Sequence, residues 1–213
     1  MIQPDNPFKI AFLLSGSGST MENLLNHIIS GKVKAKISVV ISSCENAYGI
    51  KRAENWDIPY KIVPFKTYKS DLIAYSNKIS AIIDSYNINL IVFGGFMSQY
   101  IIPQHYINKA INIHPALIPA FCGKGFYGDK VHQAVLDYGV KITGCTVHFV
   151  DQNYDTGPII TQESVIINDS DTLDSIKEKV QNLERSLYPR VIQAIVENRV
   201  IVNGRHVKIL KEI

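Results

Sequence analysis

The fold and the chemistry of this chain both centre on the stretch Lys109–Pro158, which reads KAINIHPALIPAFCGKGFYGDKVHQAVLDYGVKITGCTVHFVDQNYDTGP. Its opening residues, 110–114, alternate like a short buried strand, so Asn112 and His114 project from the same face. Pro115 then ends the strand. Because a residue before a proline stays extended, we expect the His114 imidazole at the carboxyl end of the strand, where open α/β sheets bind their ligands.

Asn112 and His114 suit acyl transfer. The amide can donate to a developing oxyanion, and a histidine that titrates near neutral pH can move the proton when an amine attacks a carbonyl. The candidate for an accompanying carboxylate is Asp155, in the tight turn DTGP at residues 155–158. If folding brings Asp155 against His114, its charge raises the histidine pKa and orients the ring. On the residues alone, a turn-capping asparagine, a core histidine and a loop aspartate remain an open alternative.

A second motif lies near the start of the chain. Residues 9–14, KIAFLL, form an apolar strand that runs into SGSGST at 15–20 and then into apolar residues at helical spacing as far as Gly31. A small-residue loop at a helix start favours a phosphate. No lysine follows and the third glycine of a dinucleotide fingerprint is missing, which disfavours ATP and NAD. The glycines could equally serve only a tight turn.

The rest of the chain alternates strands and helices. Further strands are predicted over residues 36–42, 59–63, 89–93, 141–150 and 159–167, and helices over 47–56, 69–86 and 172–198. This order predicts an α/β fold, a Rossmann-like, doubly wound and mostly parallel sheet with helices on both faces and a long C-terminal helix. Asn203-Gly204 predicts a terminal hairpin.

Composition indicates one globular domain. The chain has 213 residues, 46% of them hydrophobic, and a formal net charge of +3. No apolar run approaches the roughly 18 residues of a membrane helix, and residues 1–8 lack a signal-peptide core. We therefore expect a cytoplasmic protein that binds neither membrane nor nucleic acid. The cysteines, Cys44, Cys122 and Cys145, show no CxxC spacing, so neither a disulfide framework nor a metal site is expected.

Two further features have open interpretations. His132 and His148 show no metal-ligand spacing, and His148 lies inside a predicted strand, so a structural or supporting role is expected for it. The glycine-rich stretch 121–129 is interpreted either as a cover over a cleft or as a surface connection.

The motif NIHPALIP at 112–119, followed by VHFV at 147–150 and DTGP at 155–158, resembles the formyltransferases that use 10-formyl-tetrahydrofolate. The resemblance runs from about residue 9 to about residue 199. It implies one formyltransferase domain over 1–213, with a phosphate-binding half at about 9–95 and a catalytic and folate half at about 96–199.

The resemblance also implies roles. Asn112, His114 and Asp155 would catalyse direct formyl transfer, with no covalent intermediate and no metal. Within the family, the chain is similar to members that formylate glycinamide ribonucleotide in de novo purine synthesis. The residues implied to bind this substrate are Gly18, Ser19 and Thr20 for its phosphate, with Gln181 and Glu184. Those implied to bind the folate are Met97, Ser98, Gln99, Tyr100 and Asn112.

Departures and alternatives accompany this resemblance. Relatives have an arginine where Leu72 stands here, and many have glycine at Thr156. Another folate-dependent formyltransferase acting on a different amine, a hydrolase of the formyl group, and a non-catalytic phosphate-ligand binding protein are the alternatives. The resemblance allows a homodimer.

Overall fold

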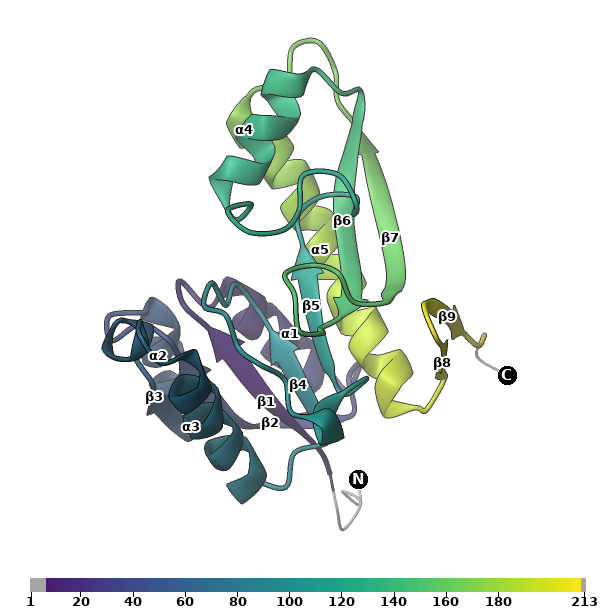
Figure 1. Cartoon of the computed structure of the whole chain (residues 1–213). Coiled ribbons are helices and arrows are strands. Elements are labelled where there is room, and N and C mark those ends of the chain that lie inside the picture. Colours follow the sequence, from purple (N-terminus) through teal and green to yellow (C-terminus); the bar gives the residue numbers. More distant parts are fainter. Residues whose placement is uncertain (1–6, 212–213) are drawn as a thin grey trace. The chain divides into compact units, whose positions relative to one another are not determined.

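The computed structural model describes residues 7–211. Its strands form a seven-stranded sheet in the order β3-β2-β1-β4-β5-β6-β7 and a separate two-stranded sheet, β8-β9 (Figure 1). The chain divides into two compact units, 1–111 and 112–213. The division falls inside β5 (Ala110–His114), beyond residue 95, where the sequence predicted the boundary between two halves. No helix among residues 7–211 is long and apolar enough to cross a membrane.

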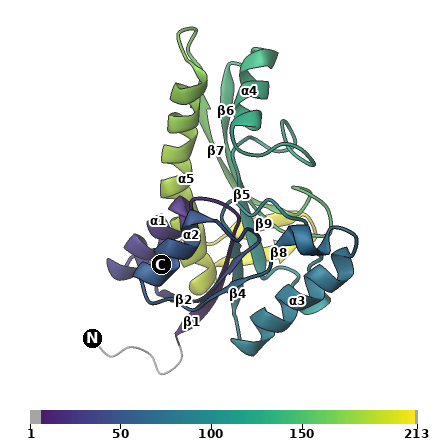
Figure 2. The ribbon, with the colours of Figure 1, turned by 90° about the vertical axis from the view of Figure 1, so that its left-hand side faces the viewer.

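The first unit is a parallel βαβ arrangement, in which β1 pairs with both β2 and β4, and β2 pairs with β3. Its elements are β1 (Phe8–Leu14), α1 (Ser19–Ile29), β2 (Ala35–Ser42), α2 (Tyr48–Asn55), β3 (Tyr60–Ile62), α3 (Leu72–Ser85), β4 (Leu90–Phe93) and the 3-10 turns Phe65–Tyr68 and Gln104–Tyr106. The pair α1 and α2 covers one side of these strands and α3 the other (Figure 2). Strands covered on both sides must be apolar throughout, as β4 is.

The second unit packs helices beside an antiparallel strand pair, β6 with β7. Its elements after β5 are α4 (Asp129–Tyr138), β6 (Ile142–Phe149), β7 (Ile159–Ile166), α5 (Leu173–Val196), β8 (Val200–Asn203) and β9 (His206–Ile209). Thr172 and Ser175 form a reciprocal capping box that starts the long helix α5. The hairpin predicted at Asn203-Gly204 is present.

The predicted fold class is confirmed, and the differences are local. The helix expected from residue 69 begins at Leu72, because the Asp71 carboxylate accepts from the Ala74 N–H at 2.8 Å and so caps it there. Helix α4 was not predicted. It follows a glycine-rich loop, and one of its three buried positions is the polar His132, so only Val131 and Val135 mark its buried side as apolar.

The close approach of β6 to β7 requires a glycine at position 144. A Cβ built there would lie 1.9 Å from the Glu163 carbonyl oxygen, which is a backbone atom that cannot rotate away. We expect Gly144→Ala to lower the free energy of unfolding by about 3 kcal/mol through overpacking. Gly16→Ala is the control, since a Cβ at Gly16 meets nothing within 4 Å, and it should change stability by less than about 0.5 kcal/mol. Urea denaturation measures both, and equal stabilities would contradict this prediction.

Candidate active site

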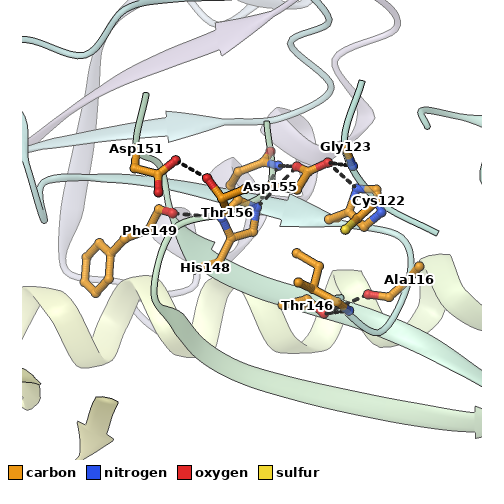
Figure 3. A network of polar contacts seen from close by, with 12 residues as sticks. Ala116, Cys122, Gly123, Thr146, His148, Phe149, Asp151, Asp155 and Thr156 are labelled. Atoms are coloured by element: carbon orange, nitrogen blue, oxygen red, sulfur yellow. Dashed lines mark hydrogen bonds and ion pairs between the residues drawn. The ribbon is translucent and has the colours of Figure 1, made fainter. Parts of the chain in front are cut away.

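The second unit brings together the three polar residues expected to act as a group. Asn112 and His114 come from β5, and Asp155 comes from the loop between β6 and β7. Nδ1 of His114 lies 3.5 Å from one Asp155 carboxylate oxygen, and Nδ2 of Asn112 lies 3.5 Å from the other. Figure 3 shows Asp155 at the centre of this network. Asn112 and Asp155 are 43 positions apart in the sequence, so only the tertiary structure brings them into contact.

The loop that carries Asp155 is held in a specific shape. Asp155 has a left-handed backbone, with φ of 57°, a conformation that costs a residue other than glycine free energy. The Asp151 carboxylate accepts from the Thr156 hydroxyl at 2.7 Å (Figure 3). Arg205, at the tip of the terminal hairpin, donates to the Thr156 carbonyl at 2.9 Å. A Cβ at Gly157 would lie 1.8 Å from the Phe149 carbonyl oxygen, so the turn also requires this glycine.

The environment of Asp155 keeps its carboxylate ionised. Burial raises its pKa, but the contacts with His148 and His114 and the backbone N–H of Gly123 outweigh burial, and the pKa is lowered overall. The Gly123 N–H donates to the carboxylate at 2.8 Å. The charge is therefore stabilised by hydrogen bonds from several directions.

His114 is 3% exposed, and its pKa is lowered overall. Burial is the largest effect and lowers its pKa, while Asp155 and the Phe121 carbonyl act in the opposite direction. Asp155 thus acts in the direction expected from the sequence, but the expected net rise in the histidine pKa is not found, because desolvation of the charged ring outweighs it. Nε2 of His114 donates to the Phe121 carbonyl at 2.8 Å.

Backbone groups of the segment 121–123 are functional candidates that the sequence did not reveal. Phe121 and Gly123 have positive φ values of 49° and 91°, which turn the Phe121 carbonyl to His114 and the Gly123 N–H to Asp155. Side-chain identity gives no signal for such contacts. The glycines of this stretch were the available hint, since they permit left-handed backbone.

In the first unit, the loop before α1 leaves the helix start accessible. The N-cap residue of α1 is Gly18, which has φ of 73° and no side chain to cap the first-turn N–H groups. A Cβ at Gly18 would lie 2.7 Å from Cα of Gly49, so the loop packs tightly against the start of α2. Ser19 is exposed and Thr20 is half-buried. This geometry fits a phosphate at the helix N-terminus.

A serine that was not singled out in the sequence joins this loop to the segment predicted to bind folate. The Ser15 hydroxyl lies 2.6 Å from the Ser43 hydroxyl and accepts from the Met97 N–H at 2.9 Å. Met97 is exposed, whereas Ser98 and Gln99 are half-buried. Tyr100 is different, because its hydroxyl is buried 2.9 Å from that of Ser80 and burial raises its pKa to about 12.

Gln181 and Glu184 lie one turn apart on α5, in the second unit. The Gln181 side chain accepts from Arg185 at 3.3 Å. Burial raises the pKa of Glu184 to about 7, against a smaller opposing effect of Arg185. Burial has removed water from this carboxyl group, which makes its ionisation costly. A polar ligand that forms hydrogen bonds with the group would replace that water.

Among residues 7–211, no group of three or more histidine, cysteine, aspartate or glutamate side chains is arranged to hold a metal ion. The three cysteines are free thiols.

Comparison with known proteins places this arrangement in a family. Residues 8–192 match the formyl transferase family, which is most of the chain. The chain belongs to this family.

Particular relatives narrow the similarity further. The chain is 34% identical over 197 residues to the chloroplastic phosphoribosylglycinamide formyltransferase of Arabidopsis thaliana, covering 90% of this chain and 66% of that protein. It is 33% identical over 199 residues to the trifunctional purine biosynthetic protein adenosine-3 of Gallus gallus, covering 92% of this chain and 19% of that protein. The chain therefore spans less than two thirds of each relative.

A solved structure of similar length also matches. The glycinamide ribonucleotide transformylase 1 of Symbiobacterium toebii superposes with a TM-score of 0.88 at 31% identity, covering 98% of this chain and 96% of that one.

The raised pKa of Glu184 predicts a pH dependence of stability. Its folded-state pKa of about 7 exceeds the ordinary 4.5, so protonated Glu184 stabilises the fold below about pH 4.5, and this contribution is lost as the pH rises through about 7. Relative to Glu184→Gln, the wild type should lose on the order of 2 kcal/mol of unfolding free energy between about pH 5 and about pH 8.

Urea denaturation at both pH values measures this difference. Glu178→Gln is the matched control, since Glu178 is an exposed residue of the same helix. Parallel pH slopes in the wild type and Glu184→Gln would show that burial does not perturb this carboxyl group.

Proposed function

We propose that this protein transfers the formyl group of 10-formyl-tetrahydrofolate to the amine of glycinamide ribonucleotide, a step of purine synthesis. The observation that carries the proposal is the contact of Asp155 with both Asn112 and His114, each at 3.5 Å. The similarity to phosphoribosylglycinamide formyltransferases over most of the chain supports the choice of substrate.

The reaction is a direct acyl transfer. A bond forms between the amine nitrogen of the ribonucleotide and the formyl carbon, and the bond from that carbon to N10 of the folate breaks. One proton passes from the amine to N10. Attack produces a tetrahedral intermediate whose oxygen bears negative charge, so the protein must supply hydrogen-bond donors and a proton carrier.

Asn112 and His114 supply these functions in our proposal. One N–H of the Asn112 amide and a protonated His114 ring stabilise the oxyanion, while the Asp155 carboxylate orients the ring and favours its charged form. Burial opposes that charge. A histidine whose contacts favour the proton and whose burial disfavours it can both gain and lose that proton within one turnover.

The structure adds a condition to this mechanism. Nε2 of His114 donates to the Phe121 carbonyl, and Nδ1 faces Asp155. An oxyanion that uses the Nε2–H must therefore replace the Phe121 carbonyl as its acceptor. We propose that the segment 121–123 withdraws when the substrates bind.

Binding residues are assigned within each unit. In the first unit, the N–H groups at Gly18, Ser19 and Thr20 would hold the phosphate of the ribonucleotide, and Met97–Tyr100 would line the folate pocket, Tyr100 through its backbone because its hydroxyl contacts Ser80. In the second unit, Gln181 and Glu184 would accept hydrogen bonds from the polar groups of the ribonucleotide. A cytoplasmic location and a homodimer stay predictions from the sequence.

Replacing the central carboxylate tests the trio. Asp155→Asn should lower kcat for formyl transfer to glycinamide ribonucleotide by about a hundredfold or more. The reason is that the variant removes the negative charge that favours the protonated form of His114. Asp169→Asn, which removes an exposed carboxylate paired with Lys141, should leave kcat unchanged. The assay follows release of tetrahydrofolate at saturating substrates.

The outcome for the wild type distinguishes the alternatives. No turnover with this amine, together with stabilisation by a folate analogue in thermal unfolding, would move the proposal to another acceptor. Release of formate without any acceptor would indicate a hydrolase.

Two glycines at the ends of helix α1 test the phosphate site. Gly18 and Gly31 have φ of 73° and 76°, so alanine at either position introduces similar backbone strain. Only at Gly18 does the added Cβ also meet backbone, 2.7 Å from Cα of Gly49, which displaces the loop. Gly18→Ala should raise KM for glycinamide ribonucleotide about tenfold or more, while Gly31→Ala leaves this KM within about twofold. Equal effects of the two variants on this KM would argue against phosphate binding at the loop.

A further inference from the structure

His148 contacts two members of the catalytic trio and was assigned no chemical role. It lies on β6 and is 1% exposed. Figure 3 shows its ring beside Asp155. We propose that His148 is a positioning residue for formyl transfer, which fixes the amide of Asn112 in the orientation that catalysis needs and acts on the carboxylate of Asp155 through that amide. This inference rests on the function proposed above.

The ring of His148 has a defined orientation. Its Nδ1 lies 2.8 Å from the Phe149 carbonyl oxygen, which only accepts hydrogen bonds. In the neutral ring the proton is therefore on Nδ1, and Nε2 is an acceptor. Nε2 lies 3.2 Å from Nδ2 of Asn112, so the amide donates to the ring.

This contact determines which end of the Asn112 amide faces the carboxylate. Nδ2 lies near two acceptors, Nε2 of His148 and an oxygen of Asp155. A flipped amide would set its own oxygen against both, which is repulsive. His148 uses one N–H at 3.2 Å. The second N–H has only the 3.5 Å contact with Asp155 and is available to an oxyanion.

The Asn112 amide, once oriented by His148, also restricts the Asp155 carboxylate. One carboxylate oxygen lies 3.5 Å from Nδ2 of Asn112. The other accepts from the Gly123 N–H at 2.8 Å and lies 3.5 Å from His114. Because contacts reach both oxygens, the carboxylate cannot rotate freely, and the oxygen that orients His114 stays in place.

The first test replaces the ring. His148→Phe should lower kcat about tenfold or more and change the KM of either substrate by less than about threefold, because the ring acts on transition-state donors. His148→Gln should recover part of this loss, since its side-chain oxygen can accept from Asn112. Val147→Ala is the control, since Val147 is a buried neighbour on the same strand that makes no polar side-chain contact with the trio. It should lower stability without lowering kcat.

A double-mutant cycle separates positioning from a general structural role. If His148 acts through Asn112, then adding His148→Phe to Asn112→Ala should lower kcat little beyond Asn112→Ala alone. Fully additive losses in kcat would show that His148 does not act through Asn112. A kcat for His148→Phe equal to that of Val147→Ala would overturn the inference while leaving the proposed function intact, provided that the wild type turns over.

A measurement on the wild type does not depend on activity. Nitrogen-15 NMR of histidine-labelled protein, with His148→Gln used to assign the signal, reports which ring nitrogen carries the proton. We expect a protonated Nδ1 and an unprotonated Nε2 for His148 near neutral pH. A ring protonated on Nε2 would overturn the inference even if the chain proved to act on another substrate.

Discussion

The partly buried carboxylate of Asp155 is the constraint on which the candidate site depends. An ionised group removed from water is strongly destabilising unless hydrogen bonds replace its hydration. Here the Gly123 N–H donates to the carboxylate at 2.8 Å, and the Asn112 amide and the His114 ring lie 3.5 Å from its oxygens. These partners belong to different segments of the second unit, so this one charge draws together the end of β5 and the glycine-rich loop. The geometry proposed for catalysis is thus also the geometry that stabilises the partly buried charge.

Backbone groups do as much in this site as side chains. The Phe121 carbonyl and the Gly123 N–H reach His114 and Asp155 because two residues adopt left-handed backbone. In the first unit, Ser15 links the loop before α1 to the Met97 N–H. In both units, polar contacts fix the shape of loops that begin or end at strands. The polar groups on these loops are therefore held in defined positions next to a rigid sheet.

Much of the fold was predictable because strong local patterns agree with the tertiary structure. The bounds of β1, β4 and α5 were predicted to within a few residues. The two strands are apolar runs, and the helix has apolar residues at helical spacing. Helix α4 was missed, since it follows a glycine-rich loop and buries only two apolar residues, Val131 and Val135. Among site residues, the motif around Asn112 and His114 identified the pair together with Asp155, but it gave no sign of the role of Phe121, since that role belongs to a carbonyl.

The sequence by itself determined the fold class, the strand that presents Asn112 and His114, and the glycine loop before α1, because periodicity and turn chemistry act over neighbouring residues. Only the tertiary structure decided that Asp155 meets both side chains, that His148 contacts two of the three, and that burial outweighs Asp155 in setting the pKa of His114. Desolvation and contacts across 36 or more positions depend on how distant segments pack, and no local pattern encodes them.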